Sequence, residues 1–296
     1  MILLAGGSGQ LGTRVVRALT GRGLAVRVLT RDPGRASHLT GQHVEVVRGD
    51  VRDPASVSAA AAGATIVVSA VHGFIGPRGI SPETIDRDGN ANLIDAARAV
   101  GADIVLMSVL GAAADSPMEL FRMKYAAERY LQASGVPATI VRSAAFLETW
   151  IELLRKTAGR SGRPLVFGRG DNPINFVSVT DVAAVVERVV TDPTTRGRTL
   201  EISGPQNLTL NQLALSVQAS ADRVSAPRHV PPLLLRLAAQ TAGRLNPTVG
   251  RQVRAALAMD TGDLSAQPTA IRQIYTEIPN TTLEMLLATP GLHTQS

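Results

Sequence analysis

Continuous apolar runs alternate with amphipathic stretches through the first half of the chain, and this alternation constrains the fold more than any other feature. The runs are rich in β-branched residues and lie near residues 2–5, 24–30, 43–48, 64–69, 102–108 and 137–142. Helical patterns lie between them, near residues 10–22, 54–62, 84–100 and 117–134. Strands that are apolar along their whole length are typical of parallel sheets covered by helices on both faces. The sequence therefore predicts an α/β fold with a doubly wound parallel sheet and right-handed crossovers.

The second half of the chain has a different rhythm. Residues 162–190 predict two short strands and then a helix that begins at Thr180, and "RTLEISG" predicts one more buried strand. From Pro205 onward, helical pieces are separated by Pro and Gly. We therefore expect a core of residues 1–142, joined by about 175–204, and a smaller, mostly helical lobe of residues 143–174 and 205–296.

Composition excludes several kinds of site. The chain has no cysteine, which removes disulfides and thiolate metal ligands, and we expect no metal site. Aromatic residues make up only 3%, so few side chains are available to stack on bases, and we expect no nucleic-acid partner. The beginning "MILLAGGSG" lacks the basic and long apolar regions of a signal peptide, and no apolar stretch is long enough to span a bilayer. We predict a cytoplasmic protein without a membrane partner, and leave its oligomeric state open.

A glycine-rich loop follows the first predicted strand. "ILLAG" runs into "GGSGQLG", which places Gly6, Gly9 and Gly12 at three-residue spacing directly before a helix. Glycine permits a tight turn, close approach of a pyrophosphate and close packing of the helix on the strand, while the helix N-terminus attracts phosphate. This context predicts a Rossmann dinucleotide-binding site, with further loop contacts from Ser8, Gln10 and Leu11.

The end of the second strand indicates which nicotinamide cofactor is preferred. An acidic residue there would hold a ribose hydroxyl, but "VLTRDPGRA" presents Thr30 and Arg31. Arg31 can pair with a 2′-phosphate, with Arg14 or Arg35 as helpers, so we predict NADPH in preference to NAD. The neighbouring Asp32 is interpreted as a helix N-cap before a proline.

Several blocks of the chain together resemble the NmrA-like, atypical branch of the short-chain dehydrogenase/reductase superfamily. They are "GGSGQLG", "VRGDVRDPASV", "KYAAERYLQASGVPATIVRSAAF", "NFVSVTDVAAVV" and "LEISGPQNLTLNQLA", and they cover about residues 1–215. The resemblance implies that Asp50 and Val51 lie beside the adenine, and that Lys124 reaches the nicotinamide ribose. It also implies that three residues line the cofactor, namely Ser69, Ala70 and Val71. A turn residue in "GDVRDP" is the alternative role for Asp50.

The catalytic tyrosine of that superfamily is missing. In "ELFRMKY" the position four residues before Lys124 is occupied by Leu120, and Tyr125 points about 100° away from Lys124 on a helix. Ser108 ends the fifth strand near the place of the family's serine, but Val109 breaks the usual serine pair. Lys124 and Ser108 are therefore the candidate catalytic residues. A proton from water or from the substrate's own hydroxyl is the predicted replacement for the tyrosine.

Three roles remain open for Lys124. It can hold the ribose hydroxyls, act as the acid or base as in the related isoflavone-reductase-like enzymes, or pair with Glu128 one helical turn away.

Apolar and aromatic side chains are the predicted substrate contacts. They are His72, Phe74, Leu120, Phe146, Trp150 and Phe167. We expect an NADPH-dependent ketoreductase or quinone reductase acting on a bulky, apolar, aromatic small molecule such as a secondary metabolite, with the smaller lobe binding the substrate. The alternative is a non-catalytic NADP-binding redox sensor of the NmrA type, and an epimerase or dehydratase with tightly held NAD is disfavoured by Arg31.

Residues 223–254 contain six arginines and no carboxylate. The amphipathic "PPLLLRLAAQTAG" within them is interpreted as a solvated lid helix, with a membrane surface or a protein partner as alternatives.

Overall fold

A seven-stranded sheet forms the centre of the N-terminal part of the chain in the computed structural model, which describes residues 1–39, 41–76, 79–223, 225–241 and 246–288. The strand order is β10-β6-β5-β4-β1-β2-β3, and β1 to β6 pair in parallel. This order places β4 at the centre with β1 beside it, and the chain winds outward from β1 through β2 to β3 and from β4 through β5 to β6, as in a dinucleotide-binding fold. The strands are β1 (Ile2–Ala5), β2 (Val26–Thr30), β3 (Val44–Arg48), β4 (Ile66–Ser69), β5 (Asp103–Val109), β6 (Ala138–Ser143) and β10 (Thr199–Ile202).

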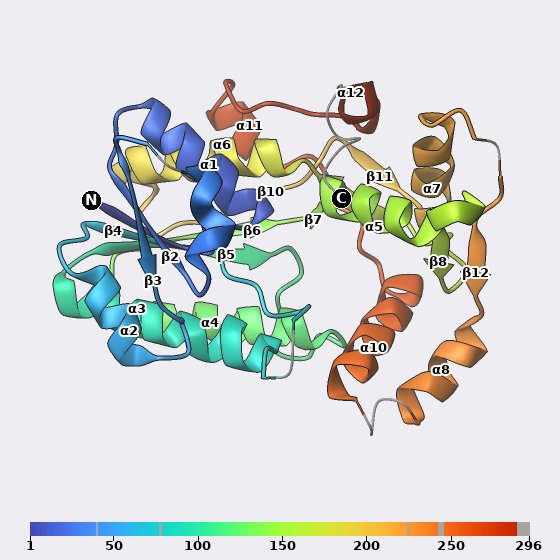
Figure 1. The fold of residues 1–296 in the computed structure, drawn as a ribbon, viewed down its shortest axis with the longest axis horizontal. Coiled ribbons are helices and arrows are strands. Elements are labelled where there is room, and N and C mark those ends of the chain that lie inside the picture. Colours follow the sequence, from blue (N-terminus) through green and yellow to red (C-terminus); the bar gives the residue numbers. More distant parts are fainter. Residues whose placement is uncertain (40, 77–78, 224, 242–245, 289–296) are drawn as a thin grey trace. The chain divides into compact units, whose positions relative to one another are not determined.

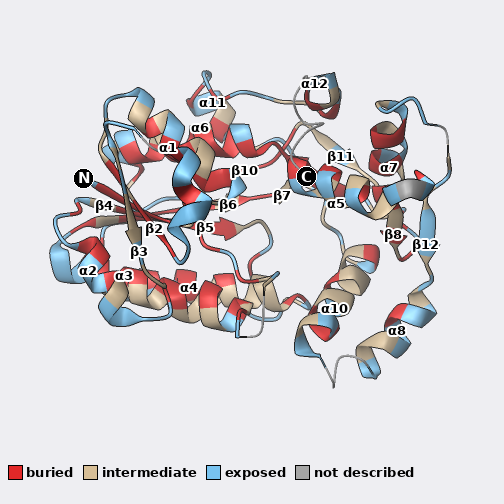
Figure 2. Ribbon diagram, in the orientation of Figure 1, coloured by how far each residue is buried: buried red, intermediate tan, exposed pale blue. Residues whose placement is uncertain are grey.

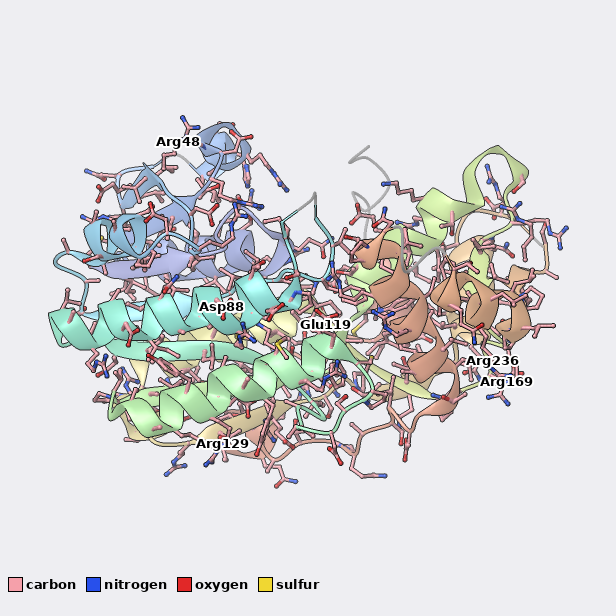
Figure 3. The ribbon with its side chains drawn as sticks, turned by 90° about the horizontal axis from the view of Figure 1, so that it is seen from below. Arg48, Asp88, Glu119, Arg129, Arg169 and Arg236 are labelled. Atoms are coloured by element: carbon pink, nitrogen blue, oxygen red, sulfur yellow. The ribbon has the colours of Figure 1, made fainter. Side chains whose placement is uncertain are left out.

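Helices cover both faces of this sheet. In Figure 1, α1 (Gln10–Gly21) and α6 (Val179–Thr191) lie on one face, and three helices lie on the other. Those three are α2 (Pro54–Ala61), α3 (Asp88–Val100) and α4 (Glu119–Ser134), and Figure 3 shows α3 and α4 side by side with Arg129 projecting outward from α4. All four residues of β1 are buried, and Figure 2 shows the central strands buried between the helices. The predicted doubly wound parallel sheet is therefore confirmed.

Three local features differ from the sequence-based expectation. The helix expected from residue 84 begins as a π-helical turn, η2 (Pro82–Arg87), and continues as α3. The helix expected to begin at Thr180 begins at Val179. The strand in "RTLEISG" forms, but only Ile202 within β10 is buried, because β10 lies at an edge of the sheet. The prediction that this strand is buried was wrong, since an edge strand leaves side chains accessible.

The chain divides into two compact units. The first comprises Met1–Ser143, Val179–Glu201 and Ile271–Ile278, and the second comprises Ala144–Ser178, Ile202–Ala270 and Pro279–Ser296. From the sequence we expected a core of residues 1–142 with about 175–204, and a smaller lobe of residues 143–174 and 205–296.

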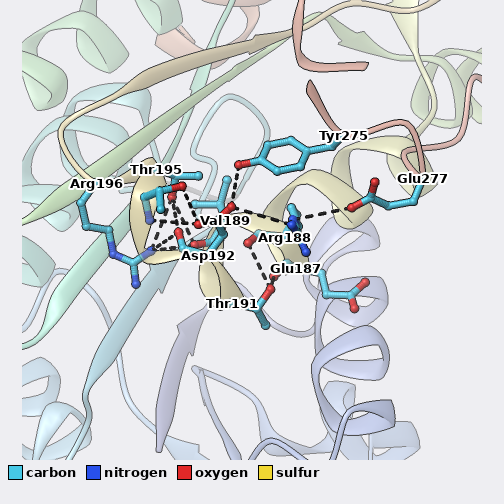
Figure 4. A network of polar contacts seen from close by, with 10 residues as sticks. Glu187, Arg188, Val189, Thr191, Asp192, Thr195, Arg196, Tyr275 and Glu277 are labelled. Carbon is cyan, nitrogen blue, oxygen red and sulfur yellow. Dashed lines mark hydrogen bonds and ion pairs between the residues drawn. The ribbon is translucent and has the colours of Figure 1, made fainter. Parts of the chain in front are cut away.

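Polar contacts explain why Ile271–Ile278 belongs with the first unit. This segment contains the short helix α11 (Ile271–Ile274), and Figure 4 shows how it meets the end of α6. The Tyr275 hydroxyl donates to Asp192 Oδ2 at 2.8 Å, and the Arg188 guanidinium lies 4.8 Å from the centre of the Tyr275 ring. Arg272 pairs with the buried Asp181 at 2.9 Å. These contacts join side chains 83 to 91 residues apart in the sequence, which no local sequence pattern reveals.

The second unit combines helices with two small sheets. Its helices are α5 (Leu147–Ala158), α7 (Leu210–Ala219), α8 (Pro232–Gln240), α10 (Pro247–Thr261) and α12 (Leu283–Ala288). One sheet has the order β11-β9-β7, and the other pairs β12 with β8. The strands are β7 (Ala145–Phe146), β8 (Leu165–Phe167), β9 (Ile174–Val177), β11 (Gln206–Leu208) and β12 (Arg228–Val230). Within the described residues, no helix is both long and apolar enough to cross a membrane.

The predicted lid helix forms as α8. Leu235 is buried, whereas Leu233, Leu234 and Leu237 are exposed. Arg244, one of the six arginines of this basic region, lies outside the described residues. The lid role itself stays a prediction.

Candidate functional site

The glycine loop joins β1 to α1 in a turn that only glycine fits at two of the three predicted positions. Gly6 has φ +90°, and a Cβ atom there would lie 2.5 Å from the carbonyl oxygen of Ala70. A Cβ atom on Gly12 would lie 2.2 Å from the carbonyl oxygen of Gly6, so this glycine lets α1 pack on the loop. Gly7, which the sequence analysis did not single out, is equally constrained because its Cβ would lie 2.6 Å from Val28 Cγ1.

Gly9 is different from the other loop glycines. It is the N-cap of α1 with φ −85° and ψ 173°, a conformation open to any residue, and the nearest atom to an added Cβ is Gly6 O at 3.3 Å. The backbone conformation therefore does not require glycine at this position, and a side chain would need Gly6 O to shift by only a few tenths of an ångström. Of the two reasons for a glycine here, a positive φ or close approach of a phosphate, the structure excludes the first, and the second stays a prediction.

The N-terminus of α1 presents its first backbone amides without a side-chain cap, and its first turn holds no acidic residue. Ser8 is half-buried, Gln10 is exposed and Leu11 is buried, so the loop offers backbone and small side chains rather than bulk. The dipole of the helix N-terminus attracts a phosphate here. The loop thus fits a dinucleotide pyrophosphate.

At the end of β2, the polar side chains have distinct partners. Asp32 Oδ1 accepts from the Gly34 amide at 3.0 Å directly before the 3₁₀ helix η1 (Pro33–Leu39), which matches the predicted capping role. The Thr30 hydroxyl donates to the Asp32 carbonyl at 3.1 Å. Arg31 is exposed, and among the described residues no carboxylate pairs with it. Its guanidinium is therefore available to an external anion.

The residues expected beside the adenine are held by turn contacts. The Asp50 carboxylate accepts from Arg52 Nη2 at 2.5 Å and from the Arg52 backbone amide at 3.0 Å. The hydrogen bond from the Arg52 side chain, the largest cause, lowers the pKa of Asp50 below its usual value. Val51 is buried, and its carbonyl accepts from Asn92 Nδ2 at 2.8 Å. The turn role of Asp50 is thus present in the structure, and the adenine contact stays a prediction.

The end of β4 and the two residues that follow it lie beside the glycine loop. The Ala70 amide donates to Ala5 O at 2.9 Å, which fixes this segment beside β1. Ser69 is fully buried and its hydroxyl donates to Asn90 Oδ1, so only its backbone is left to face a ligand. Val71 is buried and its carbonyl accepts a hydrogen bond from Lys124.

Lys124 lies buried inside the first unit with three oxygen partners. Its Nζ donates to Val71 O at 3.0 Å and to Met107 O at 2.9 Å, and it lies 3.0 Å from Asp86 Oδ1. The last contact is an ion pair by distance, although its angle departs from that of a well-aligned hydrogen bond. The predicted alternative of a Lys124–Glu128 pair was wrong.

Glu128 instead pairs with Arg142. Arg142 Nη2 donates to Glu128 Oε2 at 2.6 Å and Arg142 Nε to Glu128 Oε1 at 3.0 Å. Two parallel hydrogen bonds from a guanidinium outcompete a single contact with an ammonium group, and β6 places Arg142 within reach.

Asp86 and Asn90 are the site residues that the sequence analysis missed. A signal was available, because positions 86, 90, 93 and 97 share one face of a helix and the last two are apolar. Polar residues on an otherwise buried helix face need partners inside the protein. Both are fully buried in the structure.

Ser108 lies buried on β5, directly after Met107. Among the described residues its Oγ has no hydrogen-bond partner. A buried hydroxyl without a partner is costly and marks a position where a ligand can complete the hydrogen bonding. Leu120 is half-buried at the position of the absent tyrosine, and Tyr125 is half-buried as well.

The predicted substrate contacts are divided between the units. In the first unit, the rings of His72 and Phe74 have centroids 6.1 Å apart, and His72 is exposed. In the second unit, Trp150 meets Phe176 edge-on at 6.1 Å and packs against the hydrophobic core, which is a structural role. Phe146 and Phe167 are half-buried on β7 and β8. Within the described residues, no group of three or more His, Cys, Asp or Glu could hold a metal ion.

A comparison with protein families matches residues 6–193 to a family described as NAD(P)H-binding. The match begins at the first glycine of the loop, includes β2 to β6 of the seven-stranded sheet and ends two residues past α6. The chain belongs to this NAD(P)H-binding family. The narrower NmrA-like assignment stays a prediction.

Characterised relatives include reductases and an assembly factor. An NAD(P)H azoreductase of Xenophilus azovorans is 30% identical over 225 residues, which cover 75% of this chain and 74% of the relative. A photosystem II assembly factor of Trieres chinensis is 26% identical, covering 82% of this chain and 76% of that protein. Quinone oxidoreductase 2 of Escherichia coli is 28% identical over 216 residues, covering 72% of each chain.

The structure of that Escherichia coli quinone oxidoreductase, determined as a complex with NADPH, has the same fold. It aligns with a TM-score of 0.76 at 23% sequence identity, over 97% of this chain and 98% of the other. The likeness extends over both units of the chain, including the segments beyond residue 193.

Proposed function

We propose that this protein is an NADPH-dependent reductase of a carbonyl group, a ketone or a quinone, on a bulky apolar aromatic molecule. The observation that carries the proposal is the glycine loop before α1, where no side chain caps the helix N-terminus, combined with the exposed Arg31 at the end of β2, which has no carboxylate within ion-pair distance among the described residues. Similarity to an NAD(P)H azoreductase and to a quinone oxidoreductase supports a reductase.

Arg31 supports the preference for NADPH. Its guanidinium is exposed and offers a fork of donors to a 2′-phosphate, whereas the nearby Asp32 carboxylate is engaged as a cap. Asp32 therefore does not take the place of the acidic residue that binds a ribose hydroxyl in NAD-dependent proteins.

The proton step is proposed to use water or a hydroxyl of the substrate. Bound NADPH supplies a hydride, and reduction of a quinone to a hydroquinone also takes up one proton. Lys124 already has three oxygen partners, and Leu120 carries no proton to donate. Among the described residues the Ser108 hydroxyl has no hydrogen-bond partner, which supports a role in donating a hydrogen bond to a bound carbonyl oxygen.

Oxidation of NADPH by the pure protein tests the proposal, with 1,4-naphthoquinone, aromatic ketones and an azo dye as substrates. Single-turnover kinetics at saturating NADPH then tests the proton step in Ser108→Ala, His72→Ala and Lys124→Met. We expect each variant to lose less than about a thousandfold in the chemical step, because none of the three residues is the proposed proton donor. Loss of a true general acid typically costs roughly 10²–10⁴-fold. A larger loss with intact cofactor affinity would identify a side-chain acid.

A non-catalytic NADP-binding redox sensor is the second candidate. The absent tyrosine, the fully engaged Lys124 and the similarity to a photosystem II assembly factor favour it. Tight NADPH binding without oxidation by any of these substrates, together with a difference in partner binding between NADP and NADPH, would support this candidate over the enzyme.

A further inference from the structure

The buried ammonium group of Lys124 ties together three separate parts of the first unit. Only 5% of its side chain is exposed, and Nζ lies within 3.0 Å of oxygens from Val71, Met107 and Asp86. An ammonium group has three N–H donors and no acceptor. Two of these donors have backbone acceptors and the ammonium charge faces the Asp86 carboxylate, so holding a ribose would compete with contacts that already lie within the first unit.

Asp86 occupies an unusual backbone position. It is fully buried within the π-helical turn Pro82–Arg87, a rare geometry that often accompanies a functional site. Its Oδ1 faces Lys124 and its Oδ2 accepts from the Gly73 amide at 2.9 Å. Asn90, one turn further along in α3, donates from Nδ2 to the Asp86 carbonyl at 2.6 Å and so stabilises the π-helical turn.

These contacts hold the backbone on both sides of His72. The carbonyl of Val71 accepts from Lys124, and the amide of Gly73 donates to Asp86. Gly73 is also confined by packing, because a Cβ atom there would lie 2.3 Å from the carbonyl oxygen of Ser81. The His72 side chain, by contrast, is exposed. Fixing the backbone on both sides of His72 sets the direction of its Cα–Cβ bond, from which the exposed ring projects.

We propose that the Asp86–Lys124 pair is a clamp on residues 71–73 that directs His72 toward the substrate. Asp86 and Lys124 are positioning residues in this proposal, since they act through His72 rather than by touching a reacting atom. The role of His72 toward the substrate rests on the reductase function proposed above. The clamp on residues 71–73 does not depend on that function, because all the contacts that form it lie within the chain.

Hydrogen exchange in the cofactor-free protein tests the clamp without any substrate. The paired variant Asp86→Leu/Lys124→Met removes both charges, so neither is left buried without its partner. We expect amides of residues 71–74 to exchange at least about tenfold faster in this variant, because Gly73 loses its acceptor. Asp86→Asn, which keeps the side-chain shape, serves as a second variant in case the paired one does not fold. Glu128→Gln, which alters another buried carboxylate on α4, is the control and should leave this segment unchanged.

Steady-state reduction of 1,4-naphthoquinone tests whether the clamp acts through His72. The paired variant should lower kcat/KM for the quinone more than about tenfold while changing KM for NADPH less than about threefold. In a protein that already carries His72→Ala, the same paired change should cost less than about threefold, because residues that act as a unit are non-additive.

Unchanged exchange at residues 71–74 would overturn the clamp. If the paired change and His72→Ala lowered kcat/KM for the quinone by fully additive amounts, the role of His72 would be overturned. If Lys124→Met lost more than about tenfold in NADPH affinity while hydrogen exchange at residues 71–74 stayed unchanged, Lys124 would be assigned to the ribose instead. If the wild-type protein reduces no quinone, the proposed reductase fails, whereas the exchange measurement still decides whether the clamp exists.

Discussion

Replacement of Gly9 by valine separates cofactor binding from folding more cleanly than any other change in the loop. Gly9 has φ −85° and ψ 173°, which valine adopts, and the new Cβ would lie 3.3 Å from Gly6 O, a tight contact that a shift of a few tenths of an ångström relieves. Loss of a glycine N-cap costs about 1 kcal/mol or less of unfolding free energy. A side chain at this position would, however, occupy the space that a pyrophosphate needs beside the helix N-terminus.

The expected result is a large loss of affinity with a small loss of stability. We expect NADPH affinity, measured by isothermal titration calorimetry, to fall at least about 100-fold, or about 2.8 kcal/mol. Urea unfolding should show a change of about 1 kcal/mol or less.

Two other glycines of the same helix provide matched controls. Gly12→Ala should lower stability by at least about 1–3 kcal/mol, because its Cβ would lie 2.2 Å from Gly6 O. Gly21→Ala, at the other end of α1, has no atom within 4 Å of the new Cβ. It should raise stability by about 0.5–1 kcal/mol through helix propensity and leave NADPH affinity unchanged. Unchanged NADPH affinity in Gly9→Val would refute the assignment of the loop to the cofactor.

Three further predictions concern the cofactor, the missing tyrosine and acid stability. Arg31→Ala should weaken NADPH binding by about 1.5–3 kcal/mol and leave NADH binding nearly unchanged, since the lost ion pair exists only with a 2′-phosphate; calorimetry giving equal losses for both would contradict this. Leu120→Tyr should not raise kcat for quinone reduction, because Lys124 is engaged with Asp86 and backbone oxygens and cannot assist the new phenol; a several-fold faster single-turnover rate would count against it. Hydrogen bonds from Thr194 and then Tyr275 lower the pKa of Asp192 to about 2 from 3.8. A carboxyl group with a lowered folded-state pKa stabilises the protein above its unfolded pKa, and this contribution disappears as pH falls from about 4 to about 2. The unfolding free energy of Asp192→Asn, measured with urea, should therefore fall less than that of the wild-type protein between about pH 4 and pH 2. Parallel plots of unfolding free energy against pH for the two proteins would exclude a stabilising role for the Asp192 carboxylate.

The sequence by itself determined the architecture of the first unit and the place of the cofactor loop. Continuous apolar strands such as Ile2–Ala5 need cover on both faces, and the helical patterns between them can supply it only in a parallel sheet. The spacing of Gly6, Gly9 and Gly12 behind the first strand is equally local information. Such features follow from residues close together in the chain, where periodicity and turn chemistry act.

Only the tertiary structure decided which polar groups meet. Lys124 has a carboxylate one helical turn away at Glu128, and the sequence made that pair a reasonable expectation. The fold instead brings Arg142 to Glu128 and Asp86 to Lys124. Which partner a buried charge selects depends on strand order, on the π-helical turn that orients Asp86, and on the need to satisfy every buried polar group at once. These are properties of the packed molecule, and neighbouring residues in the chain do not encode them.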